Sequence, residues 1–100
     1  MSAASGNGHD TERDTEQSLL VFPCRFDLKV VGRANGRFEA MAQEIVTRHV
    51  TATDLHAVQS RPSRDANYVA FTFVFTARSR AQLDALYREL SGCAEVLFAL

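Results

Sequence analysis

The chain has 100 residues, of which 46% are hydrophobic, with a formal net charge of -1 and a pI near 6.3. That length allows one domain with a modest core, and so small a charge gives no general attraction to nucleic acid or anionic membranes. Two cysteines and no signal-peptide pattern predict a reduced, cytoplasmic setting. No apolar run approaches the roughly 20 residues of a membrane span, so we expect no membrane association.

Residues 1–18 differ sharply in composition from the rest of the chain. They contain no Leu, Ile, Val or aromatic residue, and four acidic residues against one arginine give them a net charge of -3. Such a segment buries too little apolar surface to offset an ordering entropy of about 1–2 kcal/mol per residue. The sequence therefore predicts a disordered N-terminal tail over 1–18 and a folded domain over 19–100.

The domain begins with alternating residue types. Between Cys24 and Val31 apolar side chains alternate with Arg25, Asp27 and Lys29, which predicts a half-buried strand. A turn over 32–36, with Asn35 as a suitable N-cap, precedes apolar residues at helical spacing over 36–50. A weaker strand follows over 51–60, and SRPSRDA over 60–66 has the composition of a turn.

The strongest strand signal is NYVAFTFVFTA over 67–77. Val69 and the phenylalanines at 71, 73 and 75 share one face, and Ala70, Thr72, Val74 and Thr76 share the other. We expect the phenylalanine face to be buried under helices and the other face to be open. The reverse orientation would bring two threonine hydroxyls into the core.

The last third of the domain predicts a second helix and a final strand. Ser79 and Gln82 match a capping box, after which Leu83, Leu86, Tyr87 and Leu90 recur at helical spacing up to Gly92. Residues 93–100 then form a predicted strand with Val96, Phe98 and Leu100 on one side.

The order strand, helix, strand, strand, helix, strand favours an α+β fold. With right-handed crossovers and one apolar face per strand, it predicts a ferredoxin-like βαββαβ sandwich. The four-stranded antiparallel sheet would run fourth, first, third, second, with both helices on one face.

Five segments in collinear order resemble the YbeD-like family of small, largely uncharacterised bacterial proteins. They are FPCRFDLKVVG (22–32), TRH (47–49), SRDANY (63–68), LYREL (86–90) and EVLFAL (95–100). The resemblance covers about residues 20–100 and implies a ferredoxin-like fold similar to ACT regulatory domains. The family usually has a glycine where Ala66 stands, which leaves open whether this turn uses a conformation that favours glycine.

The sequence offers little for catalysis or metal binding. It has no G-x-S-x-G elbow, and Cys24 and Cys93 are interpreted as small apolar residues. His9 lies in the tail, and His49 and His56 occur singly, without metal-ligand spacing. The resemblance carries no established catalytic residue. We therefore expect no enzymatic activity, no metal and no cofactor.

Two surfaces are candidates for binding. Arg61 and Arg64 flank Pro62 and could hold an anion, although a solvated turn is the simpler interpretation. On the open sheet face, candidate contact residues are Arg25, Lys29, Tyr68, Thr72 and Val74; Glu95 and Leu97 of the last strand are expected to share this face.

These features, with the analogy to ACT-like domains, favour a small non-catalytic regulatory or binding module. Its partner could be a second copy in a homodimer, another protein or a small-molecule effector. The alternative is a single-stranded RNA-binding domain that uses the sheet face, because RNA-recognition motifs share this topology. A third possibility is that the open sheet face is simply solvated and binds no partner. Nucleic acid is the less favoured ligand, since the phenylalanines that would stack on bases are expected in the core.

Overall fold

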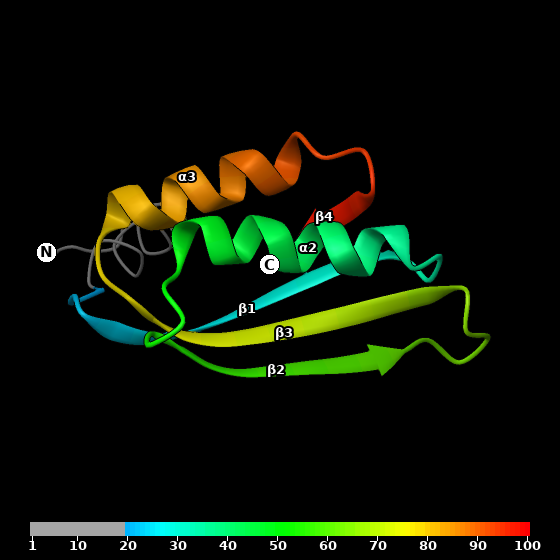
Figure 1. The fold of residues 1–100 in the computed structure, drawn as a ribbon, viewed down its shortest axis with the longest axis horizontal. Coiled ribbons are helices and arrows are strands. Elements are labelled where there is room, and N and C mark those ends of the chain that lie inside the picture. The colour runs from blue at the N-terminus through cyan, green and yellow to red at the C-terminus, as the bar shows by residue number, and fades with distance from the viewer. Residues whose placement is uncertain (1–19) are drawn as a thin grey trace, which may run out of the picture.

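The computed structural model describes residues 20–100, so the predicted tail lies outside the described residues. Within them the strands form one antiparallel sheet in the order β2-β3-β1-β4, and both helices cover the same face (Figure 1). The predicted ferredoxin-like α+β sandwich is confirmed. The elements are β1 (Cys24–Arg33), α2 (Arg37–His49), β2 (Leu55–Pro62), β3 (Tyr68–Ala77), α3 (Arg80–Ser91) and β4 (Val96–Ala99).

Strand β3 lies between β1 and β2 and carries the centre of the core. Phe71, Phe73 and Phe75 are only 6%, 1% and 0% exposed, so the predicted orientation of the phenylalanine face is correct. They form one cluster with apolar side chains of β1, α2 and α3. Burial of each such ring contributes about 1.5–3 kcal/mol. This layer of apolar contacts fixes which face of the sheet remains open.

The predicted turn after β1 begins two residues too early. Gly32 is still part of β1, where a Cβ atom would come within 2.3 Å of the Phe38 ring and 2.7 Å of the Glu95 carbonyl oxygen. The strand continues because Gly32 and Arg33 still pair with Val69 and Tyr68 of β3. The missing Cβ at Gly32 permits the close approach of α2. The N-cap of α2 is Gly36 and not Asn35 as predicted, but the Asn35 Oδ1 still accepts hydrogen bonds from the first backbone N–H groups of the helix, those of Arg37 and Phe38, at 2.9 and 3.0 Å.

Strand β2 is displaced relative to its predicted range of 51–60. Residues 51–54 form a turn instead, in which the N–H groups of Asp54 and Leu55 donate to the Thr51 carbonyl at 3.0 Å. The strand then runs to Pro62, which ends it. Hydrogen bonds local to the turn therefore outweigh the strand propensity of residues 51–54.

The hairpin between β2 and β3 settles the question that Ala66 left open. Ala66 adopts a left-handed φ of 63°, a conformation that costs a residue with a Cβ about 1–2 kcal/mol. Hydrogen bonds from Ala66 N–H to the Ser63 carbonyl (3.0 Å) and from Ser63 N–H to the Tyr68 carbonyl (2.8 Å) hold the turn. The glycine-type turn is thus retained with alanine.

The Ser79–Gln82 capping pair at the start of α3 is confirmed, but the Gln82 side chain bonds the residue before Ser79. The Ser79 hydroxyl accepts from the Gln82 N–H at 3.0 Å, whereas the Gln82 side-chain oxygen accepts from the Arg78 N–H at 2.6 Å. The apolar face of α3 is buried as predicted. Gly92 ends the helix, but in a right-handed conformation with φ of -84°.

The predicted orientation of the last strand is correct for Val96 but wrong for Phe98 and Leu100. Val31 lies opposite Phe98, while Gly32 lies opposite Val96, so Leu97 is an extra residue in a β-bulge. The bulge reverses the alternation: Val96 and Ala99 pack against the core, and Phe98 shares the open face with Val31. Phe98 and Leu100, both expected inside, are 50% and 66% exposed.

Candidate functional site

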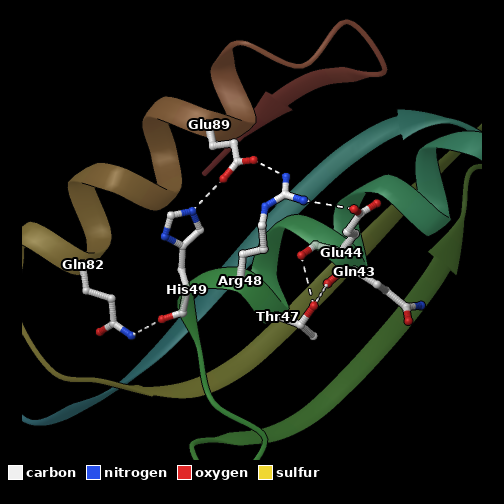
Figure 2. Close-up of polar contacts among 7 residues, drawn as sticks. All are labelled: Gln43, Glu44, Thr47, Arg48, His49, Gln82 and Glu89. Atoms are coloured by element: carbon white, nitrogen blue, oxygen red, sulfur yellow. Dashed lines mark hydrogen bonds and ion pairs between the residues drawn. The ribbon is translucent and has the colours of Figure 1, made fainter.

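A polar cluster joins the end of α2 to α3 (Figure 2). The Glu89 carboxylate accepts a hydrogen bond from the Arg48 guanidinium through one oxygen and lies 2.7 Å from His49 Nε2 through the other. Arg48 also bonds Glu44 at 3.0 Å, and the Gln82 amide donates to the His49 carbonyl at 2.8 Å. The hydrogen bond from Arg48, followed by that from His49, holds the pKa of Glu89 below its usual value.

This cluster is interpreted as a structural link between the helices. Each of its charged groups already has a partner, so it presents no free charge to a ligand. It explains why TRH and LYREL stand out in the sequence, because the first supplies Arg48 and His49 and the second supplies Glu89. Sequence reasoning placed His49 at a helix end but did not find Glu89, which lies 40 residues further along the chain.

A groove on the open face of the sheet differs from this cluster, because its charged side chains have no partner among the described residues. Its floor is β3, which presents the small side chains of Ala70 and Thr72. Register places Lys29 and Val31 of β1 beside them on one side, and Gln59 and Arg61 of β2 on the other. Large side chains on both sides of small ones leave a hollow of about 430 Å³. The complete lining is Lys29, Val31, Gln59, Ser60, Arg61, Pro62, Ser63, Tyr68, Val69, Ala70 and Thr72.

The groove has two cations and no carboxylate in its lining. Lys29 and Arg61 form no side-chain hydrogen bond or ion pair with any residue between 20 and 100. At one end the Tyr68 ring is 36% exposed, and the Arg33 guanidinium lies over it at 5.9 Å. The groove therefore combines free positive charge with an aromatic ring and small apolar surfaces.

The structure brings some of the predicted contact residues together and separates others. Lys29, Tyr68 and Thr72 line the groove, as does Arg61. Arg64 does not, because the hairpin turn places it beyond the strand, so the predicted Arg61–Arg64 pair is divided. The register that reveals the groove could not be read from the sequence. Ala70 and Val31 were expected on the open face but were not named as contact residues, and Gln59 was missed.

Three further residues expected on the open face do not line the groove. Arg25 bonds the neighbouring Asp27 at 3.2 Å. Val74 is on this face but only 8% exposed, lying between Asp27 of β1 and Ala57 of β2. Glu95 instead accepts hydrogen bonds from Asn35 and Arg37 near the start of α2, at 3.3 and 3.5 Å.

In the described part of the chain, no three His, Cys, Asp or Glu side chains gather in a way that would hold a metal ion. Neither α2 nor α3 is long and apolar enough to cross a membrane.

Comparison with known proteins places the chain in a family. Residues 17–100 match the model of a protein family of unknown function, DUF493. The chain belongs to this family. UPF0250 proteins are its relatives: that of Leptothrix cholodnii is 47% identical over 77 residues, which are 77% of this chain and 85% of the relative. That of Neisseria gonorrhoeae is 38% identical over 82 residues, 82% of this chain and 90% of the relative. The resemblance to the YbeD-like family is thereby confirmed.

Solved structures similar to this DUF493 protein agree on its fold. The solution structure of protein HP0495 from H. pylori matches with a TM-score of 0.63 at 13% identity, covering 96% of this chain and 98% of that one. The ACT domain of GTP pyrophosphokinase from Chlorobium tepidum matches with a TM-score of 0.62 at 9% identity, covering 76% and 94%. At these identities the similarity shows a shared ACT-like fold.

Proposed function

We propose that this chain is a small, non-catalytic regulatory module that binds its effector or partner in the open-face groove. The observation that carries this proposal is that Lys29 and Arg61, which have no ion-pair partner among residues 20–100, lie on strands at either side of a hollow with a small-residue floor. Elsewhere in the described chain most arginines are bound to carboxylates, so positive charge left without a partner at a concave surface favours ligand binding. The ACT-like fold supports a regulatory role by analogy.

The composition of the groove supports binding rather than catalysis. None of its lining residues is a His, Cys, Asp or Glu, so the groove lacks the side chains that most often activate a hydroxyl such as those of Ser60, Ser63 or Thr72. Lysine and arginine can position and neutralise an anion without transforming it.

RNA binding has less support than a small effector or protein partner. Single-stranded RNA is bound by aromatic side chains that stack on successive bases along a positive surface. The three phenylalanines of β3 are buried, which leaves Tyr68 in the groove and Phe98 of β4, opposite Val31, as the exposed aromatic residues of the open face. Among the described residues, no row of aromatic rings follows one strand there.

Retention of compounds from a bacterial extract tests the proposal. The full chain would be immobilised, incubated with the small-molecule and protein fractions, and the bound material identified by mass spectrometry. Ala70→Gln fills the groove floor, and Ala40→Gln makes the same change on the exposed side of α2. We expect the native chain and Ala40→Gln to retain the same species unchanged, and Ala70→Gln to lose it. Equal retention by Ala70→Gln, conversion of the species to a product, or no retained species would contradict the proposal.

A further inference from the structure

Cations without a partner are unevenly distributed over the described residues. Arg25, Arg37, Arg48, Arg78 and Arg80 each lie within ion-pair distance of a carboxylate. The cations without an ion pair are Lys29, Arg33, Arg61, Arg64 and Arg88. All but Arg88 belong to the open face of β1 and β2 or to the adjoining hairpin.

Resting on the proposed function, we infer that the groove binds a small organic anion. Its ligand would carry a carboxylate or phosphate group on a planar or apolar body. The anionic group would lie between the Lys29 ammonium and the Arg61 guanidinium, and the body would lie across Val31 and Ala70 toward the Tyr68 ring. Because no carboxylate lines the groove, nothing in it competes with the ligand for the two cations.

The spacing of the strands suits a ligand held from both sides. Lys29 and Arg61 belong to the two strands that flank β3, with Lys29 level with Thr72 and Arg61 level with Ala70. Their Cα atoms are therefore about 12 Å apart on a diagonal, two strand spacings across the sheet and two residues along it. Ala70 and Thr72 do not fill the space between the two long side chains. Both cationic groups can therefore bend over the floor onto one anion, and the Thr72 hydroxyl lies beneath it as a further donor.

The size and apolar surfaces of the groove favour a small molecule over a bare ion or a protein. A volume of about 430 Å³ falls within the range of small-molecule sites. A bare phosphate would leave Val31, Ala70 and the Tyr68 ring without contacts. A protein partner normally needs about 800 Å² of surface from each side, whereas this half-open hollow is lined by eleven residues.

The test compares three probes of similar shape: benzoate, phenyl phosphate and neutral benzamide. Their dissociation constants would be measured on the ¹⁵N-labelled full chain from amide shifts. Benzoate and phenyl phosphate are expected to bind with a Kd on the order of 1 mM, as suits a fragment held by two charge-assisted hydrogen bonds. Benzamide should bind about tenfold more weakly, and added salt should weaken the two anions only.

Variants identify the cations that hold the probe. Lys29→Gln and Arg61→Gln should each raise the Kd of phenyl phosphate about three- to tenfold, and the double variant should abolish binding. Arg88→Gln removes an exposed cation from α3 as the matched control and should change the Kd by less than about twofold. Both groove side chains are exposed, so the variants should melt as the native chain does.

The possible failures are distinguishable. If benzamide binds the groove as tightly as benzoate, the anion preference is wrong while the groove remains a binding surface. If only an acidic peptide binds, through Lys29 and Arg61, the small-molecule class is wrong and the proposed function survives. If only an oligouridylate binds, the inference and the proposed function are both wrong, and RNA binding replaces them. If the shifts lie at the Arg48–Glu89 cluster, or if neither variant weakens binding, both the inference and the groove assignment are rejected.

Discussion

Asp54 and Arg78 are joined by two hydrogen bonds across 24 residues of sequence, Nε to Oδ2 at 3.0 Å and Nη2 to Oδ1 at 2.8 Å. The pair ties the turn before β2 to the residue that follows β3. Asp54 as a residue is only 8% exposed, and the hydrogen bond from Arg78 is the main reason that its pKa lies below the usual 3.8. A planar guanidinium bound to both carboxylate oxygens is a geometry that lysine could not reproduce.

Stability should therefore fall at acid pH. A carboxyl whose pKa is lower in the folded than in the unfolded state stabilises the fold fully above its unfolded pKa, and this contribution disappears as the pH falls through the folded pKa. The pKa values of Asp54 and Glu89 are both lowered, from usual values of 3.8 and 4.5. We expect the Tm to be level near neutral pH and to drop below about pH 4.5. Asp54→Asn should make this drop in Tm smaller, whereas the control Asp84→Asn, at an exposed site, should leave the drop unchanged. A Tm that stays level down to about pH 2 would contradict the expected role of these carboxylates.

Phe73 and Thr72 are adjacent residues on opposite faces of β3. Phe73→Ala removes a buried ring and leaves a cavity, so it should lower the free energy of unfolding by about 3–5 kcal/mol. Thr72→Ala changes the open face and should cost less than about 1 kcal/mol. Thermal or denaturant unfolding of the two variants measures both effects. A larger loss for Thr72→Ala would mean that the two faces of the sheet are assigned the wrong way round.

Ala66 and Gly36 provide complementary tests of backbone strain, since both have positive φ, 63° and 81°. Ala66→Gly should stabilise the protein by about 0.5–1 kcal/mol, because relief of left-handed strain exceeds the added entropy of the unfolded chain. Gly36→Ala should destabilise it by about 1 kcal/mol through backbone strain alone, because no atom lies within 4 Å of the added Cβ. Urea unfolding resolves changes of this size; equal effects of the same sign would refute the turn assignment.

Gly32 and Gly92 test the approach of α2 to the sheet. A Cβ on Gly32 would collide with the Phe38 ring, so Gly32→Ala should cost about 1–3 kcal/mol through overpacking. At Gly92 the nearest atoms would be 3.6 Å away and φ is already right-handed. Gly92→Ala should therefore be neutral or stabilise by up to about 1 kcal/mol. Tolerance of Gly32→Ala in a melting experiment would show that Phe38 packs differently.

The order of elements and the buried face of β3 were predictable, because alternation in 67–77 and helical spacing in the two helices are strong local signals. The bulge at Leu97 was not, since it depends on how β4 pairs with β1, and one extra residue reverses every side chain after it. For the same reason, the sequence placed Lys29 and Tyr68 together on the open face but assigned Arg61 to a separate site, and did not bring the three into one groove. Their proximity is a property of strand register, which single-strand patterns do not contain.

The most direct test of the groove is an amide shift map of the ¹⁵N-labelled full chain on addition of the ligand recovered from extract, or of phenyl phosphate. The account predicts that the largest shifts fall on residues of the groove, led by Val31, Arg61, Ala70 and Thr72. The outer faces of α2 and α3 should change little, and Ala70→Gln should remove the response. Shifts confined to the helices, with the amides of β1, β2 and β3 unmoved, would contradict it.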